Sequence, residues 1–230
     1  MKKRQPFLAA DPEYAEQLTR FSVLDAVLAL AYYLLILVVY YFMGRTVSLT
    51  GRYLGVPVNL ALLLLPVLLC LKHLSAVGLS LRNLGRSLLA AAVPGILYLL
   101  SFSIIPGIVS RSPLLPAGRI LYNLFYYFIV IAMSEEVGFR GFIQPRLMPL
   151  LKREWLCILV GGILFVLMHY PYQMAARGMG FSEYLPRFLE NAPMQLLLHF
   201  VFTWYCRRYG NLFGSTLLHG CVDMTMGIFG

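Results

Sequence analysis

The chain has 230 residues, of which 60% are hydrophobic and only 13% charged, and its mean hydropathy is +0.74. Soluble domains carry about 25% charged residues, so this composition excludes a soluble globular protein. The net charge of +9 comes from Lys and Arg scattered between apolar segments. That distribution is typical of membrane anchoring and topology, and we expect no nucleic-acid partner.

Hydrophobic segments run through nearly the whole chain, and a membrane-spanning helix needs about 20 mainly apolar residues. The pattern predicts an all-α fold, a polytopic membrane helix bundle with about seven transmembrane helices. The candidate spans are 21–42, 54–71, 88–109, 120–139, 155–170, 186–206 and 212–229. We expect residues 1–20 to form a cytoplasmic or interfacial segment and residues 21–230 to form a single transmembrane bundle. Within the first segment, Asp11 and Pro12 resemble the N-cap and first position of a short helix.

The distribution of basic residues predicts the orientation of the bundle. With seven spans, thirteen of the 19 Lys and Arg residues fall on the side of the N-terminus and six on the other side. The positive-inside rule then places the N-terminus in the cytoplasm. We expect an integral, multi-pass protein of a bacterial inner membrane.

Ionisable residues stand in or at the ends of three apolar segments. Such residues are costly at membrane depth, and each is by default a candidate functional residue. Two acids, two imidazoles and a third acid on separate segments indicate a site built for proton-transfer chemistry. The residues are Glu135, Glu136 and Arg140, then His169, then His219 and Asp223.

Helix geometry separates the roles of the two adjacent glutamates. Glu136 and Arg140 are four residues apart, with the acid first, which favours an ion pair. Glu135 points about 100° away and has no such partner, so it is our candidate general base. His219 and Asp223 are also four residues apart on one face. The Asp223 carboxylate can fix the tautomer of His219 or help to bind a developing negative charge.

These residues form three motifs in a fixed order: Glu-Glu-x-x-x-Arg, Phe-x-x-x-His and His-x-x-x-Asp. The set, with Phe165 opening the second motif, resembles the CPBP family of intramembrane proteases, also called the ABI or CAAX-protease family. The Ras-converting CAAX endopeptidase is its best-known member type, and a myxosortase-like sorting subgroup also belongs to it. The resemblance covers roughly residues 118–229, which would form the catalytic core.

The resemblance implies an intramembrane endopeptidase of glutamic type, acting near the C-terminus of a membrane-anchored protein or peptide within the lipid bilayer. By position, Glu135 and His169 would activate water, and His219 with Asp223 would stabilise the oxyanion. Glu136, Arg140 and Phe165 would support them. The last motif departs from the family, in which Asn is the more familiar final residue. Because an ionised Asp repels an oxyanion, we predict that Asp223 orients His219 instead.

Metal dependence and two other function classes stay open at this point. Zinc, or another divalent metal, held by Glu135, His169 and His219 is the alternative to a metal-free site. The sequence contains no HExxH motif, and we favour no cofactor. A proton-coupled transporter would also place acids and histidines in the membrane, although we find none of the repeats it predicts. A non-catalytic membrane scaffold or immunity factor is the other alternative.

Overall fold

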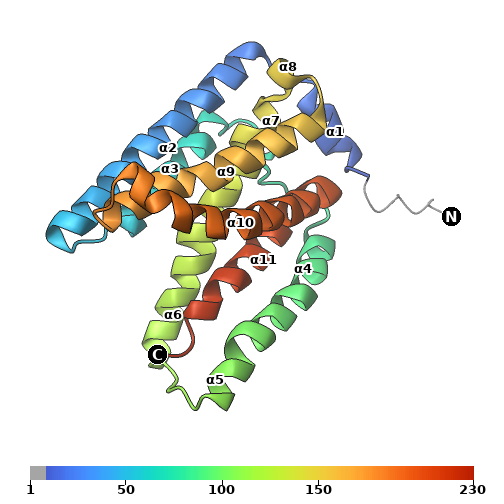
Figure 1. Ribbon diagram of the computed structural model, residues 1–230. Coiled ribbons are helices and arrows are strands. Elements are labelled where there is room, and N and C mark those ends of the chain that lie inside the picture. Colours follow the sequence, from blue (N-terminus) through green and yellow to red (C-terminus); the bar gives the residue numbers. More distant parts are fainter. Residues whose placement is uncertain (1–8) are drawn as a thin grey trace.

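The computed structural model describes residues 9–230, and every regular element in that range is a helix. Figure 1 shows a long central helix, built from α6, η3, η4, α7 and α8, with α2, α3 and α9 beside one part and α11 beside the other; α4 packs on α11. The all-α membrane bundle predicted from the sequence is confirmed. The α-helices are α1 Pro12–Leu18, α2 Val23–Thr50, α3 Gly55–Leu69, α4 Leu84–Leu99, α5 Ile105–Val109, α6 Ala117–Phe125, α7 Gln144–Arg146, α8 Met148–Leu151, α9 Glu154–Ala176, α10 Phe181–Tyr209 and α11 Phe213–Asp223. The 3-10 helices are η1 Leu74–Val77 and η5 Met224–Met226, and the π-helices are η2 Leu100–Ile104, η3 Tyr126–Met133 and η4 Glu136–Ile143.

Fewer helices than predicted have the length and composition of a membrane span. Four in the described residues meet both conditions: Val23–Thr50, Leu84–Val109, Ala117–Leu151 and Glu154–Ala176. The helix α3 is apolar but shorter, and the first half of α10 carries charged residues. The predicted span 212–229 is wrong, because α11 has only 11 residues. A helix of that length rises about 16 Å, roughly half of the hydrocarbon thickness.

The central helix extends from Ala117 to Leu151 with one turn residue at Leu147, so the predicted span 120–139 ends too early. Arg140 and Arg146, which the topology count placed on the side of the N-terminus, are buried inside this helix at 1% and 3% exposure. The π-helices η3 and η4 lie on either side of Glu135. A π-helix has more residues per turn than an α-helix, so neighbouring side chains diverge by less than about 100°. This geometry lets adjacent glutamates face the same partner.

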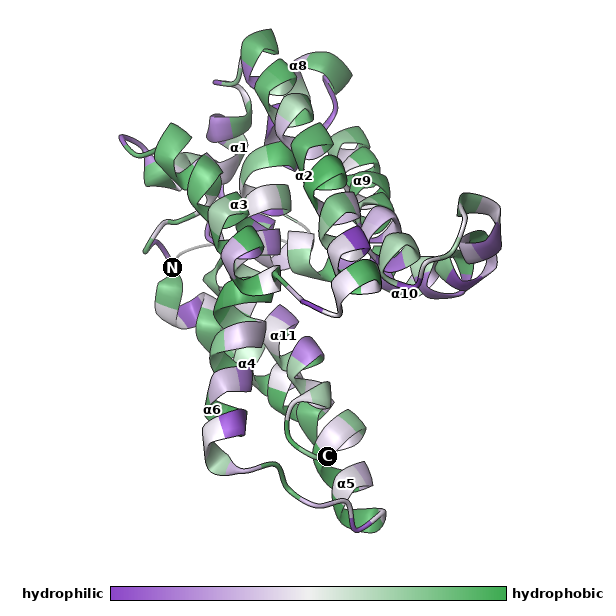
Figure 2. Ribbon diagram, turned by 90° about the vertical axis from the view of Figure 1, so that its left-hand side faces the viewer, coloured by the Kyte–Doolittle hydropathy of each residue, from purple (hydrophilic) through white to green (hydrophobic). Residues whose placement is uncertain are grey.

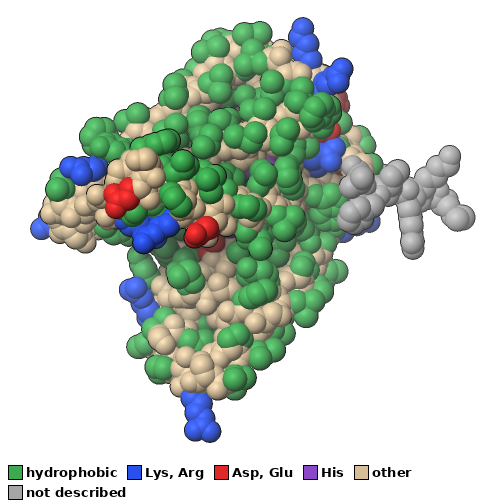
Figure 3. Space-filling model, viewed as in Figure 1, with side chains coloured by type: hydrophobic (Ala, Val, Ile, Leu, Met, Phe, Trp, Pro, Cys, Tyr) green, Lys and Arg blue, Asp and Glu red, His purple; other side chains and the backbone are tan. Residues whose placement is uncertain are grey.

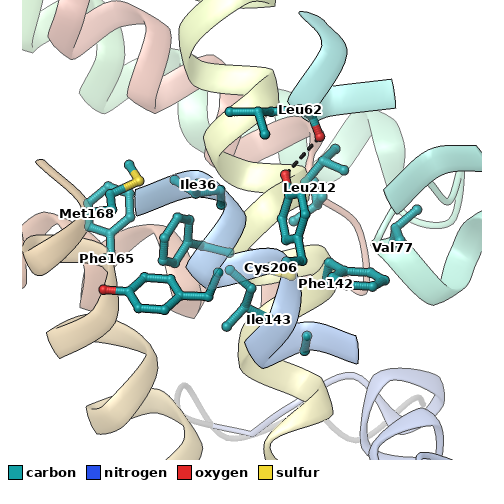
Figure 4. Packing of buried hydrophobic residues seen from close by; sticks show 14 of the residues in the cluster. Ile36, Leu62, Val77, Phe142, Ile143, Phe165, Met168, Cys206 and Leu212 are labelled. Atoms are coloured by element: carbon teal, nitrogen blue, oxygen red, sulfur yellow. Dashed lines mark hydrogen bonds between the residues drawn. The ribbon is translucent and has the colours of Figure 1, made fainter. Parts of the chain in front are cut away.

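The hydrophobic core lies between α2, the central helix and α9. Ile36 of α2 packs in one cluster with Phe142 and Ile143 of η4 and with Phe165 of α9 (Figure 4). The dashed line in that view is the hydrogen bond that the Tyr32 hydroxyl donates to the backbone oxygen of Leu62, at 2.8 Å. This contact ties α3 to α2 and thereby places both helices beside Glu135.

The outer surface of the bundle is apolar. Large side chains on α2 and α4 are exposed, among them Leu24 at 66% and Leu89 at 71%. The ribbons of both helices are mainly hydrophobic in Figure 2, and hydrophobic side chains cover most of the face shown in Figure 3. An exposed apolar surface of this extent is the kind that contacts lipid.

The N-terminal helix α1 begins as the sequence predicted. Pro12 opens it, and the Asp11 side chain caps it by accepting a hydrogen bond from the Glu13 backbone at 3.0 Å. The Asp11 carboxylate also accepts from Nε of Arg82 at 3.2 Å, and the Asp11 backbone donates to the Arg207 carbonyl at 2.7 Å. Part of the predicted segment 1–20, including Lys2, Lys3 and Arg4 of the topology count, lies outside the described residues.

Two glycines allow α11 to lie close against α4. A Cβ atom at Gly214 would lie 2.8 Å from the Ser87 backbone oxygen, and one at Gly95 would lie 2.8 Å from the Cys221 sulfur. Small residues permit this close approach between membrane helices. The position of α11, which carries His219, is thereby fixed against the bundle.

Candidate active site

His219 on α11 is the centre of the candidate site, and three carboxylates surround its ring. The Nδ1 atom lies 2.9 Å from Oε1 of Glu136. The Nε2 atom lies 3.7 Å from Oε2 of Glu135 and 3.6 Å from Oδ2 of Asp223. The face of the ring stacks on Phe202 of α10, with a centroid separation of 4.6 Å and an interplanar angle of 19°. Three acids from two helices therefore meet at one imidazole.

The predicted ion pair between Glu136 and Arg140 is present and fully buried. Nη1 of Arg140 donates to Oε1 of Glu136 at 3.0 Å, and neither side chain has any exposure. The guanidinium also lies over the Phe165 ring, 4.1 Å from its centroid, where a cation is attracted by the π electrons. Phe165, predicted from the sequence as a supporting residue, thus packs directly against the guanidinium of Arg140. Arg140 does not line the cavity that holds the other polar groups, so it is placed to hold Glu136 rather than a substrate.

His169 faces the same cavity from α9. Its Nδ1 atom lies 2.9 Å from the backbone oxygen of Phe165. A carbonyl oxygen only accepts hydrogen bonds, so Nδ1 carries the proton and Nε2 is left with its lone pair. The ring also packs edge-on against the Phe165 ring, with centroids 5.2 Å apart. Both contacts fix the orientation of an imidazole that can accept a proton or hold a water molecule.

The predicted catalytic residues share one cavity of about 330 Å³, which is large enough for several water molecules or a segment of peptide. Glu135, His169, His219 and Asp223 all line it, together with Phe165. Glu136 and Arg140 are buried and do not line the cavity. The remaining lining is rich in hydroxyl and amide groups: Tyr40, Tyr53, Tyr126, Tyr127, Tyr172, Asn59, Gln173 and Gln195.

Two acids, Asp223 predicted from the sequence and Glu136, lie near the ring of His219. The acid within hydrogen-bond distance of its ring is Glu136, whereas the Asp223 carboxylate lies slightly beyond that distance. The Oδ2 atom of Asp223 is buried without a hydrogen-bond partner among the described residues. The η4 helix places the Glu136 carboxylate next to the Nδ1 atom of the ring. Asp223 lies on α11 itself, one turn after His219 and at the last residue of the helix.

Sequence reasoning missed the wall formed by the N-terminal half of the chain. Tyr40 of α2 and Asn59 of α3 line the cavity, although both lie far from the three motifs. Asn59 is the one strongly polar residue in α3, whose other residues are apolar or glycine. A lone amide in an apolar segment was the signal that could have identified it.

The alternative site predicted for a metal consists of Glu135, His169 and His219. Among residues 9–230, no three His, Cys, Asp or Glu side chains come together in a way that could hold a metal ion. The set Glu135, His169 and His219 therefore does not form a ligand cluster. The chemistry of the site is accordingly derived from its carboxylates, imidazoles and amides.

Comparison with known proteins agrees with this geometry. The family model of type II CAAX prenyl endopeptidase Rce1-like proteins matches residues 117–225. That range begins with the central helix and contains all of the motif residues, from Glu135 to Asp223. No curated protein and no solved structure matches the chain.

Proposed function

We propose that this chain, a member of the CAAX-protease family through its residues 117–225, is an intramembrane endopeptidase in which Glu135 activates water. The observation that carries the proposal is the shared cavity. The carboxylate of Glu135 and the imidazoles of His169 and His219 line the same cavity. His219 is in turn held by the buried ion pair of Glu136 and Arg140. These are the groups that a general-base hydrolysis needs within reach of one another.

In the proposed reaction, the carboxylate of Glu135 takes a proton from a water molecule that Nε2 of His169 also holds by accepting its second hydrogen. The resulting hydroxide attacks the carbonyl carbon of the scissile peptide bond, and the carbonyl oxygen becomes an oxyanion. Glu135 then passes its proton to the amide nitrogen as the carbon–nitrogen bond breaks. The carboxylate returns to its starting form, and one water molecule has been consumed.

His219 has the second role in this scheme, stabilising the oxyanion. Its Nδ1 proton is held by Glu136, so only the doubly protonated ring presents an N–H at Nε2. The neighbouring carboxylates of Glu135 and Asp223 favour that charged ring by Coulomb attraction. An N–H donor aimed at a developing negative charge is commonly the largest single contribution to catalysis.

We infer that the substrate is a membrane-anchored protein or peptide cut near its C-terminus. A prenylated CAAX terminus, a bacteriocin-type precursor and a C-terminal sorting helix of the myxosortase type are the three candidates. The apolar outer surface supports a substrate that arrives within the bilayer. We further propose a cytoplasmic N-terminus and a bacterial inner membrane as the location.

Mass spectrometry of membrane-protein C-termini tests this function directly. Membranes from cells with the wild-type chain are compared with membranes from cells with Glu135→Gln. We expect at least one protein whose C-terminus is shortened only in the wild-type sample. Identical termini in both samples would contradict the proposed endopeptidase, and a proton-flux assay in liposomes would then examine the transporter alternative.

A further inference from the structure

Among the described residues that line the cavity, the oxyanion would find no cationic hydrogen-bond donor other than the imidazoles. Glu135 and Asp223 are acceptors when ionised, and the lining of the cavity contains no Lys or Arg in the described residues. The N–H at Nε2 of His219 lies between two carboxylate oxygens, at 3.7 and 3.6 Å, which compete for it. A neutral donor on another wall of the cavity would serve a negative oxygen better.

Asn59 of α3 provides such a group. Its side chain is buried, at 3% exposure, and lines the cavity. The Tyr40 hydroxyl donates to Oδ1 at 2.8 Å, which turns the amide nitrogen away from Tyr40. Among the described residues, that nitrogen donates no hydrogen bond. It is also not one of the side-chain atoms that are fully buried without a hydrogen-bond partner. Its N–H bonds are therefore free to serve a group in the cavity.

The backbone of Asn59 is also held next to the candidate base. The Ser134 hydroxyl donates to the Asn59 carbonyl oxygen at 3.1 Å, and Ser134 immediately precedes Glu135. This bond fixes the register between α3 and the central helix. Two hydrogen bonds, one to the side chain and one to the backbone, thus hold the amide at the cavity before any substrate arrives.

We propose that Asn59 is a catalytic residue that donates a side-chain N–H to the oxyanion of the tetrahedral intermediate. This inference rests on the proposed endopeptidase function. It places one essential group outside residues 117–225, in the half of the chain that the family model does not match. Preorganised donors of this kind lower the barrier because they need no rearrangement when the charge develops.

Other amides of the cavity are less suited to this role. Gln173 accepts a hydrogen bond from the Tyr184 hydroxyl, but its side chain is only partly buried. Gln195 has its Oε1 atom buried without a partner among the described residues, and it is held by no hydrogen bond there. Asn59 differs from both because it is buried at 3% exposure, its Oδ1 is held by Tyr40, and its backbone is bonded to the residue that precedes Glu135.

The test measures cleavage of a fluorogenic peptide that carries the terminus found to differ between wild-type and Glu135→Gln membranes. The variants are Asn59→Leu, which has nearly the same size and no donor, and Asn59→Asp, which keeps the acceptor for Tyr40. Asn191→Asp, at an exposed position of α10, is the matched control. Removal of one oxyanion donor lowers kcat about 10²–10³-fold. We expect that loss in both Asn59 variants with KM nearly unchanged, and wild-type kinetics in the control.

Tyr40→Phe provides a second measurement if either Asn59 variant fails to fold. Loss of the hydroxyl releases Oδ1 of Asn59, so kcat should fall while KM and the melting temperature in detergent stay close to wild type. Wild-type kcat in a folded Asn59→Leu protein would overturn the role of Asn59 while leaving the endopeptidase intact. Identical C-termini in wild-type and Glu135→Gln membranes would overturn both.

Discussion

Oε1 of Glu136 lies 2.9 Å from Nδ1 of His219 and also accepts a hydrogen bond from Nη1 of Arg140 at 3.0 Å. One carboxylate oxygen therefore joins the central helix to α11. Because all three side chains are buried, the geometry of His219 depends on a pair that has no contact with the cavity itself. The sequence predicted the ion pair between Glu136 and Arg140, which are four residues apart, but not the contact of Glu136 with His219.

The first prediction compares the two acids near His219. Glu136→Gln should lower kcat more than Asp223→Asn does, because only Glu136 lies within hydrogen-bond distance of the ring. Parallel measurement of kcat for both variants decides this order. A larger loss in Asp223→Asn would show that Asp223, the residue predicted from the sequence, controls the ring.

The second prediction concerns the stability of the buried pair. Arg140→Ala leaves Glu136 charged and uncompensated, and breaking such a pair costs roughly 3–5 kcal/mol. Thermal unfolding in detergent should show a clear loss of stability together with lower activity. Arg86→Ala, at an exposed site on α4, serves as the control and should unfold like the wild type. An effect on KM alone, with stability unchanged, would mean that Arg140 contacts substrate instead.

The third prediction addresses the general base. Glu135→Gln preserves the size of the side chain but cannot accept the proton of water, and loss of a general base costs at least ~10²-fold in rate. The protein should still fold, since the Glu135 side chain makes no buried ion pair of its own at hydrogen-bond distance. Single-turnover rates of this variant and of Glu190→Gln, an exposed control on α10, provide the comparison. Near-normal turnover by Glu135→Gln would end this assignment.

The fourth prediction is metal independence. The cavity brings Glu135 beside two imidazoles, and we expect this base to deprotonate water without a Lewis acid. Activity should remain complete after stringent chelation, and elemental analysis of the purified protein should find no stoichiometric metal. Zinc near one equivalent, with activity lost on removal and restored on return, would refute the metal-free mechanism.

Local patterns in the sequence predicted local structure well. The cap at Asp11 and the pair Glu136–Arg140 each depend on residues two to four positions apart, and both are present. Predictions that depended on distant segments were less accurate. Hydropathy alone cannot show that α11 ends at Asp223, because the chain continues through Met224–Met226 as the 3-10 helix η5 and the residues there are mostly apolar.

The same limit explains the part of the site that was missed. His219 and Glu136 are 83 positions apart, so no helical spacing could pair them. The π-helices η3 and η4 on either side of Glu135 also follow from no sequence rule used here, although the predicted separation of Glu135 from Glu136 is present, since only Glu135 lines the cavity. Asn59 was visible as a lone amide in α3, but its distance from the motifs hid its place in the cavity.

The bond between the Asp11 backbone and the Arg207 carbonyl has a consequence for how the chain is made. Helix α1 leaves the ribosome before its partner on α10, because α1 precedes α10 in the chain. Synthesis proceeds at about 5–20 residues per second, so the roughly 200 residues between them take on the order of 10–40 s to appear. During that interval α1 cannot dock in its final place. Helix α1 therefore docks on α10 only after α10 has been synthesised, although it precedes α10 by most of the chain.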